Sequence, residues 1–162
     1  MKLDYLQALK RIESARGAWV LHGQEPLLEQ NLTDAFRASW QAKEIERQRF
    51  DISSVSDWKN VFNALNSLSL FSNQLAIEVH GNIKPDASGL KELKNYLQHN
   101  EQNLLLVVMP KQDSSSLKTS FFQVIDANGV NVALTANYPK DRQQILAVEA
   151  HKLGIQLAND AW

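Results

Sequence analysis

Residues 104–109 read Leu-Leu-Leu-Val-Val-Met, an unbroken apolar run that ends at Pro110. A strand that is apolar at every position is typical of the centre of a parallel sheet, because helices then cover both of its faces. Segments whose apolar side chains recur at helical spacing lie between this run and the other short apolar runs of the sequence. Four more short runs predict strands, over residues 18–21, 48–52, 75–79 and 130–134. The sequence therefore predicts an α/β domain with five largely parallel strands and right-handed crossovers.

The helical segments between these strands carry their own start signals. Pro26 falls in the first turn of a predicted helix, where its missing N–H costs nothing. Ser54 or Ser56 can cap the next helix, and Asp57 is placed favourably in its first turn. A short helix is also predicted at the start of the chain, from Leu3 to Ile12. Apolar faces of these elements carry three tryptophans that we expect in the core, namely Trp19, Trp40 and Trp58.

Composition excludes several classes of protein. The chain has 162 residues, 44% of them hydrophobic and 22% charged, as in a globular domain. A formal net charge of -1 gives no overall field that would recruit nucleic acid or an anionic membrane. The absence of cysteine excludes disulfides, thiolate catalysis and cysteine-bound zinc, and it fits a reducing compartment. Without a membrane-length apolar run or a signal-peptide pattern at Met1, we expect a cytoplasmic location.

The chain is predicted to hold one domain and the start of another. Residues 1–138 contain all five strands, and Asn137-Tyr138-Pro139 is typical of a joint. A helix follows over residues 142–152. Asn159-Asp160 is then a good helix cap, although only Ala161 and Trp162 follow it. We therefore expect residues 139–162 to be the truncated beginning of a second, helical domain.

The first strand-to-helix turn is where folds of this class bind phosphate. A phosphate loop needs two glycines, a lysine and a hydroxyl in the pattern G-x-x-x-x-G-K-[ST]. Residues 23–30 read Gly-Gln-Glu-Pro-Leu-Leu-Glu-Gln, which lacks the second glycine, the lysine and the hydroxyl. Pro26 removes a backbone donor, and Glu25 and Glu29 would repel phosphate. This turn is therefore interpreted as an ordinary loop and helix start.

The central strands also lack the carboxylates that hold magnesium in a nucleotidase. The third strand ends in Val79-His80-Gly81 and the fourth in Met109-Pro110-Lys111. Glu78 lies inside its strand, where we expect it to face solvent or a cap. Together with the incomplete phosphate loop, this predicts a domain that does not hydrolyse ATP and needs no cofactor or metal.

An alternative hypothesis is a small α/β enzyme that works at the carboxyl edge of the sheet. His22 and His80 both follow strands, so parallel pairing brings them to the same edge, with Glu25 nearby. A metal or acid–base site there would need these side chains to converge. The sequence contains no G-x-S-x-G nucleophile elbow to support a serine hydrolase.

The stretch of residues 67–72, Ser-Leu-Ser-Leu-Phe-Ser, connects a predicted helix to the third strand. Leu70 and Phe71 are adjacent, and neither a strand nor a helix puts neighbouring side chains on one flat face. Two interpretations remain open. The pair could end the helix and enter the core, as large apolar residues usually do. It could instead be an exposed apolar anchor that inserts into a pocket of a partner.

The order of these motifs resembles the delta subunit of the bacterial DNA polymerase III clamp loader. The resemblance rests on Leu-His-Gly-Gln-Glu-Pro-Leu-Leu at residues 21–28 and on Asp57-Trp58 opening a helix. Ser-Leu-Phe-Ser at residues 69–72, the strand at 104–108 and the segment 147–157 complete it. It spans essentially the whole chain, which is less than half of a full delta subunit.

The resemblance implies an AAA+ (RecA-like, P-loop NTPase-type) fold that has lost nucleotide binding. It implies that Leu70 and Phe71, flanked by Ser69 and Ser72, bind the beta sliding clamp and that the ring then opens at one interface. Asn73 and Gln74 stand where an arginine is common in the family, so an auxiliary polar contact with the clamp is not implied. The implied partners are the clamp, primed DNA, and the delta prime and gamma/tau subunits, which the family joins through a collar domain outside this chain. No membrane partner is implied.

Overall fold

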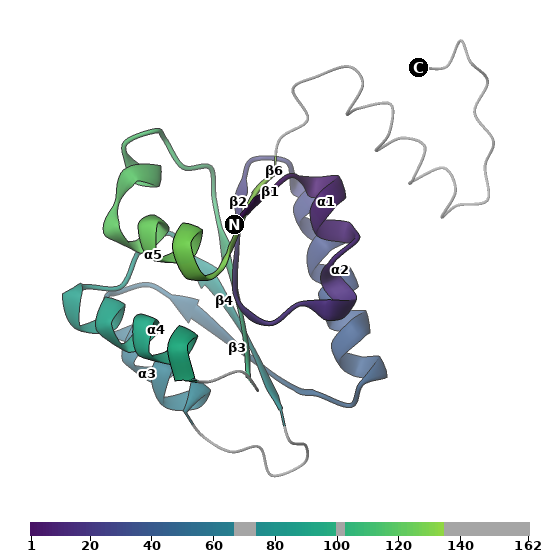
Figure 1. Cartoon of the computed structure of the whole chain (residues 1–162), viewed down its shortest axis with the longest axis horizontal. Coiled ribbons are helices and arrows are strands. Elements are labelled where there is room, and N and C mark those ends of the chain that lie inside the picture. The colour runs from purple at the N-terminus through teal and green to yellow at the C-terminus, as the bar shows by residue number, and fades with distance from the viewer. Residues whose placement is uncertain (67–73, 100–102, 135–162) are drawn as a thin grey trace, which may run out of the picture.

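The computed structural model describes residues 1–66, 74–99 and 103–134. Figure 1 shows a central sheet with helices on both faces. The elements follow one another as β1 (Lys2–Leu3), α1 (Tyr5–Leu9), the 3₁₀ helix η1 (Ile12–Ser14), β2 (Gly17–Gly23), α2 (Pro26–Ala42), β3 (Glu46–Ile52), α3 (Asp57–Leu65), β4 (Leu75–Gly81), α4 (Ala87–His99), β5 (Leu104–Met109), the 3₁₀ helix η2 (Ser116–Lys118), α5 (Ser120–Asn128) and β6 (Val130–Leu134).

The sheet that the described residues form has six strands in the order β1-β6-β2-β5-β4-β3, and every neighbouring pair is parallel. The five predicted strands are confirmed as β2 to β6, but the predicted count of five is wrong. The additional strand, β1, pairs Lys2 with Asn131 and Leu3 with Val132. The first helix begins only at Tyr5, because the Asp4 side chain caps it by accepting a 2.8 Å hydrogen bond from the Gln7 N–H.

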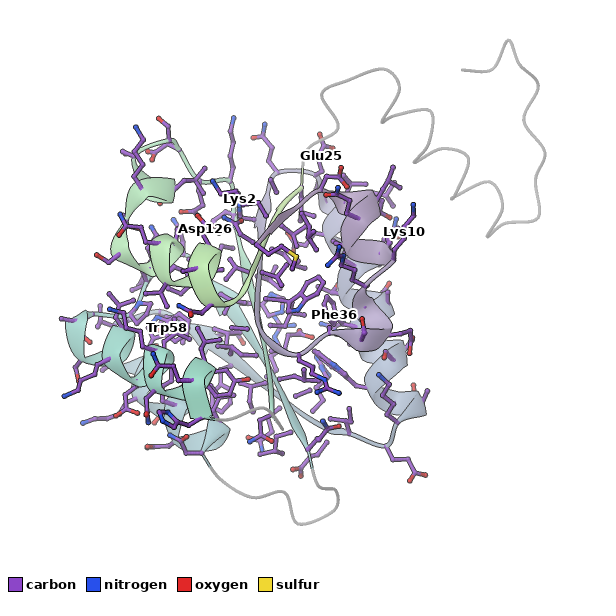
Figure 2. The ribbon with its side chains drawn as sticks, viewed as in Figure 1. Lys2, Lys10, Glu25, Phe36, Trp58 and Asp126 are labelled. Atoms are coloured by element: carbon purple, nitrogen blue, oxygen red, sulfur yellow. The ribbon has the colours of Figure 1, made fainter. Side chains whose placement is uncertain are left out.

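Two hydrophobic cores lie on the two faces of the sheet. One core packs α1 and α2 against one face, and the other packs α3, α4 and α5 against the opposite face. All six residues of β5 are buried, as predicted for a central strand covered on both sides. Figure 2 shows Phe36 of α2 and Trp58 of α3 in the two different layers. The three tryptophans predicted for the core, Trp19, Trp40 and Trp58, are all buried.

The start of α3 differs in one detail from the prediction. Ser56 precedes the helix, but its side chain makes no hydrogen bond to the helix backbone. The Asp57 carboxylate instead accepts hydrogen bonds from the backbone N–H groups of Ser53 (2.9 Å) and Ser54 (3.0 Å). These bonds lower the pKa of Asp57. The turn from β3 into α3 is therefore held by a carboxylate inside the helix rather than by a serine cap.

The predicted second domain, residues 139–162, lies outside the described residues and stays a prediction. No helix within the described ranges is long and apolar enough to cross a membrane.

Candidate functional site

The turn from β2 to α2 occupies the place where a phosphate loop would lie. β2 ends at Gly23, Glu25 precedes the helix without a side-chain cap, and Pro26 is at its first position. A Cβ atom on Gly23 would lie 2.6 Å from the carbonyl oxygen of Leu134 in β6. Glycine is therefore needed here because two backbones approach closely. The structure gives a steric reason for this glycine that is independent of phosphate.

A depression of about 590 Å³ opens beside this turn at the carboxyl edge of the sheet. Its wall contains one lysine, Lys111, and one carboxylate, Glu29. Charges of both signs do not concentrate a phosphate in the way that a lysine and a ring of backbone N–H groups do. The rest of its lining consists of uncharged residues and one histidine: Gly23, Gln24, Pro26, His80, Gly81, Val108, Met109 and Pro110.

The alternative site of His22, His80 and Glu25 is contradicted by the structure. Both histidines do lie near the carboxyl edge, as predicted, next to Met109 and Val108 of the intervening strand β5. However, His22 belongs to the α5 face, where its ring lies 5.4 Å from that of Phe122. His80 belongs to the α2 face, where it contacts Glu78. Side chains on opposite faces of one sheet cannot share a ligand or a proton.

His22 is instead part of a buried hydrogen-bonded chain. Its Nε2 lies 2.6 Å from Oδ1 of Asn131, and Nδ2 of Asn131 donates to Asp126 Oδ1 at 2.9 Å. Since the Asn131 amide donates to Asp126, its oxygen must accept from His22, which fixes the Nε2–H tautomer. Burial lowers the pKa of His22 despite the hydrogen bond that it donates to Asn131 and the charge of Asp126. His22 therefore packs as a neutral side chain.

Glu78 lies in β4 and is 0% exposed, so the prediction that it faces solvent or a cap is wrong. Arg37 of α2 donates to both carboxylate oxygens, at 2.9 and 2.6 Å, and Arg47 of β3 lies 3.3 Å away. His80 adds a contact of 2.6 Å. Burial alone would raise the pKa of Glu78, but the hydrogen bonds from His80, Arg37 and Arg47 outweigh it and hold the pKa well below its usual value.

The predicted clamp-binding residues Ser69, Leu70, Phe71 and Ser72 lie outside the described residues. The elements on either side of them are described. α3 ends at Leu65, and β4 starts at Leu75 at the amino edge of the sheet, opposite the β2–α2 turn. The assignment of Leu70 and Phe71 to an exposed tip or to the core stays a prediction.

Asn103 links α3 to β4 by hydrogen bonds, and no sequence pattern predicted this role. Its Nδ2 donates to the carbonyl oxygen of Leu65 at 2.6 Å, and its Oδ1 accepts from the N–H of Leu75 at 2.9 Å. The only sequence signal is a polar residue directly before the apolar run of β5. Its two partners lie 28 and 38 residues away, so no local pattern indicates them.

Three comparisons describe what the chain is similar to. A family model described as DNA polymerase III, delta subunit, matches residues 19–134. The DNA polymerase III subunit delta of Escherichia coli (strain K12) is 28% identical over 153 residues, which cover 92% of this chain and 44% of that protein. The structure of the Bacillus subtilis DNA clamp loader delta protein matches with a TM-score of 0.67 at 12% identity, over 91% of this chain and 47% of that one. A RuvB structure from Thermotoga maritima matches with a TM-score of 0.52 at 14% identity, over 97% of this chain and 51% of that one.

The parallel sheet, its helix layers and these structural likenesses show an AAA+-type fold, and its β2–α2 turn lacks the phosphate-loop residues. Because the family model covers most of the sequence, the chain belongs to the DNA polymerase III delta-subunit family. It spans a little under half the length of the two delta proteins that it matches.

Proposed function

We propose that this chain is the clamp-binding part of a clamp-loader subunit, which binds the beta sliding clamp and opens the ring for loading onto primed DNA. The observation that carries the proposal is the family match over residues 19–134, since this range includes both α3 and β4 and the connection between them. The proposed docking pair in that connection is Leu70 and Phe71, with Ser69 and Ser72 beside it, as the resemblance of the sequence motifs implies.

The chemistry of the pair suits a small docking anchor. Burying a leucine or a phenylalanine side chain contributes about 1.5–3 kcal/mol each. Binding energy in protein interfaces is concentrated in a few such residues that fill pockets of the partner. The amino edge of the sheet presents the ends of α3 and β4, so a partner can approach there without contact with the β2–α2 turn.

The β2–α2 turn supports a role without ATP hydrolysis in this domain. Pro26 and Glu29 stand where a phosphate loop has donors and positive charge. In the proposed assembly the nucleotide chemistry belongs to other subunits. The partners are those of the family, namely delta prime and gamma/tau, reached through a collar domain outside this chain. The domain then contributes as a subunit of the polymerase holoenzyme and not as a catalyst.

A binding measurement with a double variant tests the proposal. Leu70→Ala combined with Phe71→Ala in the whole 162-residue chain should weaken binding to an immobilised bacterial beta clamp by at least about a hundredfold, because two anchors are lost. The matched control is Leu27→Ala with Val55→Ala, which removes two apolar side chains that are 55% and 42% exposed elsewhere on the surface. Circular dichroism checks that both variants fold. Equal clamp affinity of the two double variants by surface plasmon resonance would refute the docking role.

A further inference from the structure

Asn103 holds both ends of the connection between α3 and β4 with one side-chain amide. The connection comprises residues 66 to 74, and it leaves α3 after Leu65 and enters β4 at Leu75. Nδ2 of Asn103 donates to the Leu65 carbonyl at 2.6 Å, and Oδ1 accepts from the Leu75 N–H at 2.9 Å. Asn103 itself is only 7% exposed. The two ends are therefore fixed to each other through a single buried planar group.

The amide bonds one backbone group at each end of the connection. The last carbonyl groups of a helix have no partner within the helix, and Leu65 is the last residue of α3. Leu75 is the first residue of β4, and the register pairs Ala76, not Leu75, with the first residue of β5. One donor and one acceptor at a fixed spacing are needed, and asparagine supplies both. Aspartate has no donor, and leucine of the same shape has neither.

Tyr96 also forms a hydrogen bond with Asn103. Tyr96 lies in α4, and its ring is buried in the core. Its hydroxyl group donates a short hydrogen bond to the backbone carbonyl of Asn103. Burial raises the pKa of the Tyr96 hydroxyl, so it stays protonated and remains a donor. The contact links Asn103 to helix α4 and not only to the strand that follows it.

We propose that Asn103 is a positioning residue for clamp docking. It links the two ends of the connection that carries Leu70 and Phe71. The inference rests on the proposed function. Asn103 fixes the position of Leu65 relative to Leu75, and a partner binds more tightly when the elements that carry an anchor are already held in place. Asn103 need not touch the clamp for this effect. Its loss should reduce clamp affinity in a chain that remains folded.

The chain offers a matched control in Asn131. This second buried asparagine is 6% exposed and also forms two side-chain hydrogen bonds, to His22 and Asp126, on β6 and away from α3. Asn103→Leu and Asn131→Leu each remove a hydrogen-bonded side-chain amide from a similarly buried site. Both should lower thermal stability. Only Asn103→Leu should weaken binding to an immobilised bacterial beta clamp, by about tenfold, when affinity is measured at a temperature where both variants are fully folded.

A milder variant keeps the test valid if Asn103→Leu does not fold. Tyr96→Phe removes only the hydroxyl that holds Asn103 and leaves the ring in the core. It should weaken clamp binding by about threefold, and Asn131→Leu should leave the affinity unchanged. If the Asn103 and Tyr96 variants bind the clamp as tightly as the Asn131 variant, the positioning role is wrong. If the unsubstituted chain does not bind the clamp, or binds it equally well without Leu70 and Phe71, it is the proposed function that fails.

Discussion

Arg37 of α2 donates two hydrogen bonds to the carboxylate of Glu78 in β4, from Nε to Oε1 at 2.9 Å and from Nη2 to Oε2 at 2.6 Å. This two-pronged geometry is the strongest form of an arginine–carboxylate contact. A carboxylate that is fully buried in a strand would be very unfavourable without partners, and Arg37 stabilises it together with His80 and Arg47. The contact also joins helix α2 to the sheet on the side where β3 forms the edge.

Removal of Arg37 should therefore destabilise the domain. Arg37→Met leaves Glu78 with Arg47 and His80 alone, and we expect a loss of about 2–3 kcal/mol in the free energy of unfolding, below the full cost of an unpaired buried charge. Arg49→Met is the control, because Arg49 forms an ion pair with the exposed Asp51, and its loss should change stability by at most about 1 kcal/mol. Urea unfolding followed by circular dichroism measures both. Equal losses would show that Glu78 does not depend on Arg37.

The same carboxylate should make stability depend on acid pH. In the folded chain the pKa of Glu78 is far below its ordinary value of 4.5, whereas in the unfolded chain it returns to that value. As the pH falls below 4.5, the unfolded state takes up a proton that the folded state does not, so stability falls. Glu78→Gln should remove up to about 1.4 kcal/mol per pH unit from this dependence between about pH 4 and pH 2. An unchanged acid slope in this variant would contradict the assignment.

The sequence predicted the strands well and the long-range polar contacts poorly. The run at residues 104–109 identifies a central strand, because a strand that is buried on both faces is apolar at every position. β1 was missed because a two-residue strand has no period. Glu78 was misplaced because Arg37 and Arg47 are 41 and 31 residues away in the chain, and only pairing brings them to it.

The candidate site shows the same limit. His22 and His80 were placed correctly at one edge, but their faces depend on the register between β2, β5 and β4, which no local pattern fixes. Asn103 became visible only through its contacts with Leu65 and Leu75. Leu70 and Phe71 stood out as an adjacent apolar pair, the resemblance to a family supplied the clamp as their partner, and their role stays a prediction.

His22 should give a second pH dependence, nearer to neutral. Burial lowers its pKa in the folded chain from the ordinary 6.5. As the pH falls through 6.5 towards the folded pKa, the unfolded chain binds a proton first and stability decreases. His22→Gln should abolish this loss and leave the acid dependence from Glu78 in place. Unfolding free energies measured on both sides of 6.5 test this, and a persistent slope in the variant would assign it to another group.

The first and last residues of β2, Gly17 and Gly23, should differ sharply in their tolerance of alanine. Gly17 has a φ of 69°, and a Cβ there would lie 3.7 Å from Leu97, so Gly17→Ala should cost about 1–2 kcal/mol for the backbone conformation alone. Gly23 has a φ of 155°, and its Cβ would lie 2.6 Å from the Leu134 carbonyl. Gly23→Ala should cost clearly more, about 3 kcal/mol or above, because β6 must move. Thermal unfolding of the two variants measures the difference, and equal costs would remove the steric explanation for Gly23.

ATP should not bind at the β2–α2 turn with a dissociation constant below about 1 mM, because the turn has no lysine or second glycine to hold phosphate. Pro26 has no N–H to donate, and Glu29 places a negative charge in the first turn of α2. Isothermal titration calorimetry with ATP and magnesium measures this, with an ATP-binding AAA+ protein as the positive control under the same conditions. Glu29→Lys adds a positive charge at the turn and tests whether charge alone is missing. We expect no saturable heat from this variant either, since the backbone donors of a phosphate loop are still absent. Saturable binding to the unsubstituted chain would overturn the interpretation of this turn and reopen a nucleotide-dependent role for the domain.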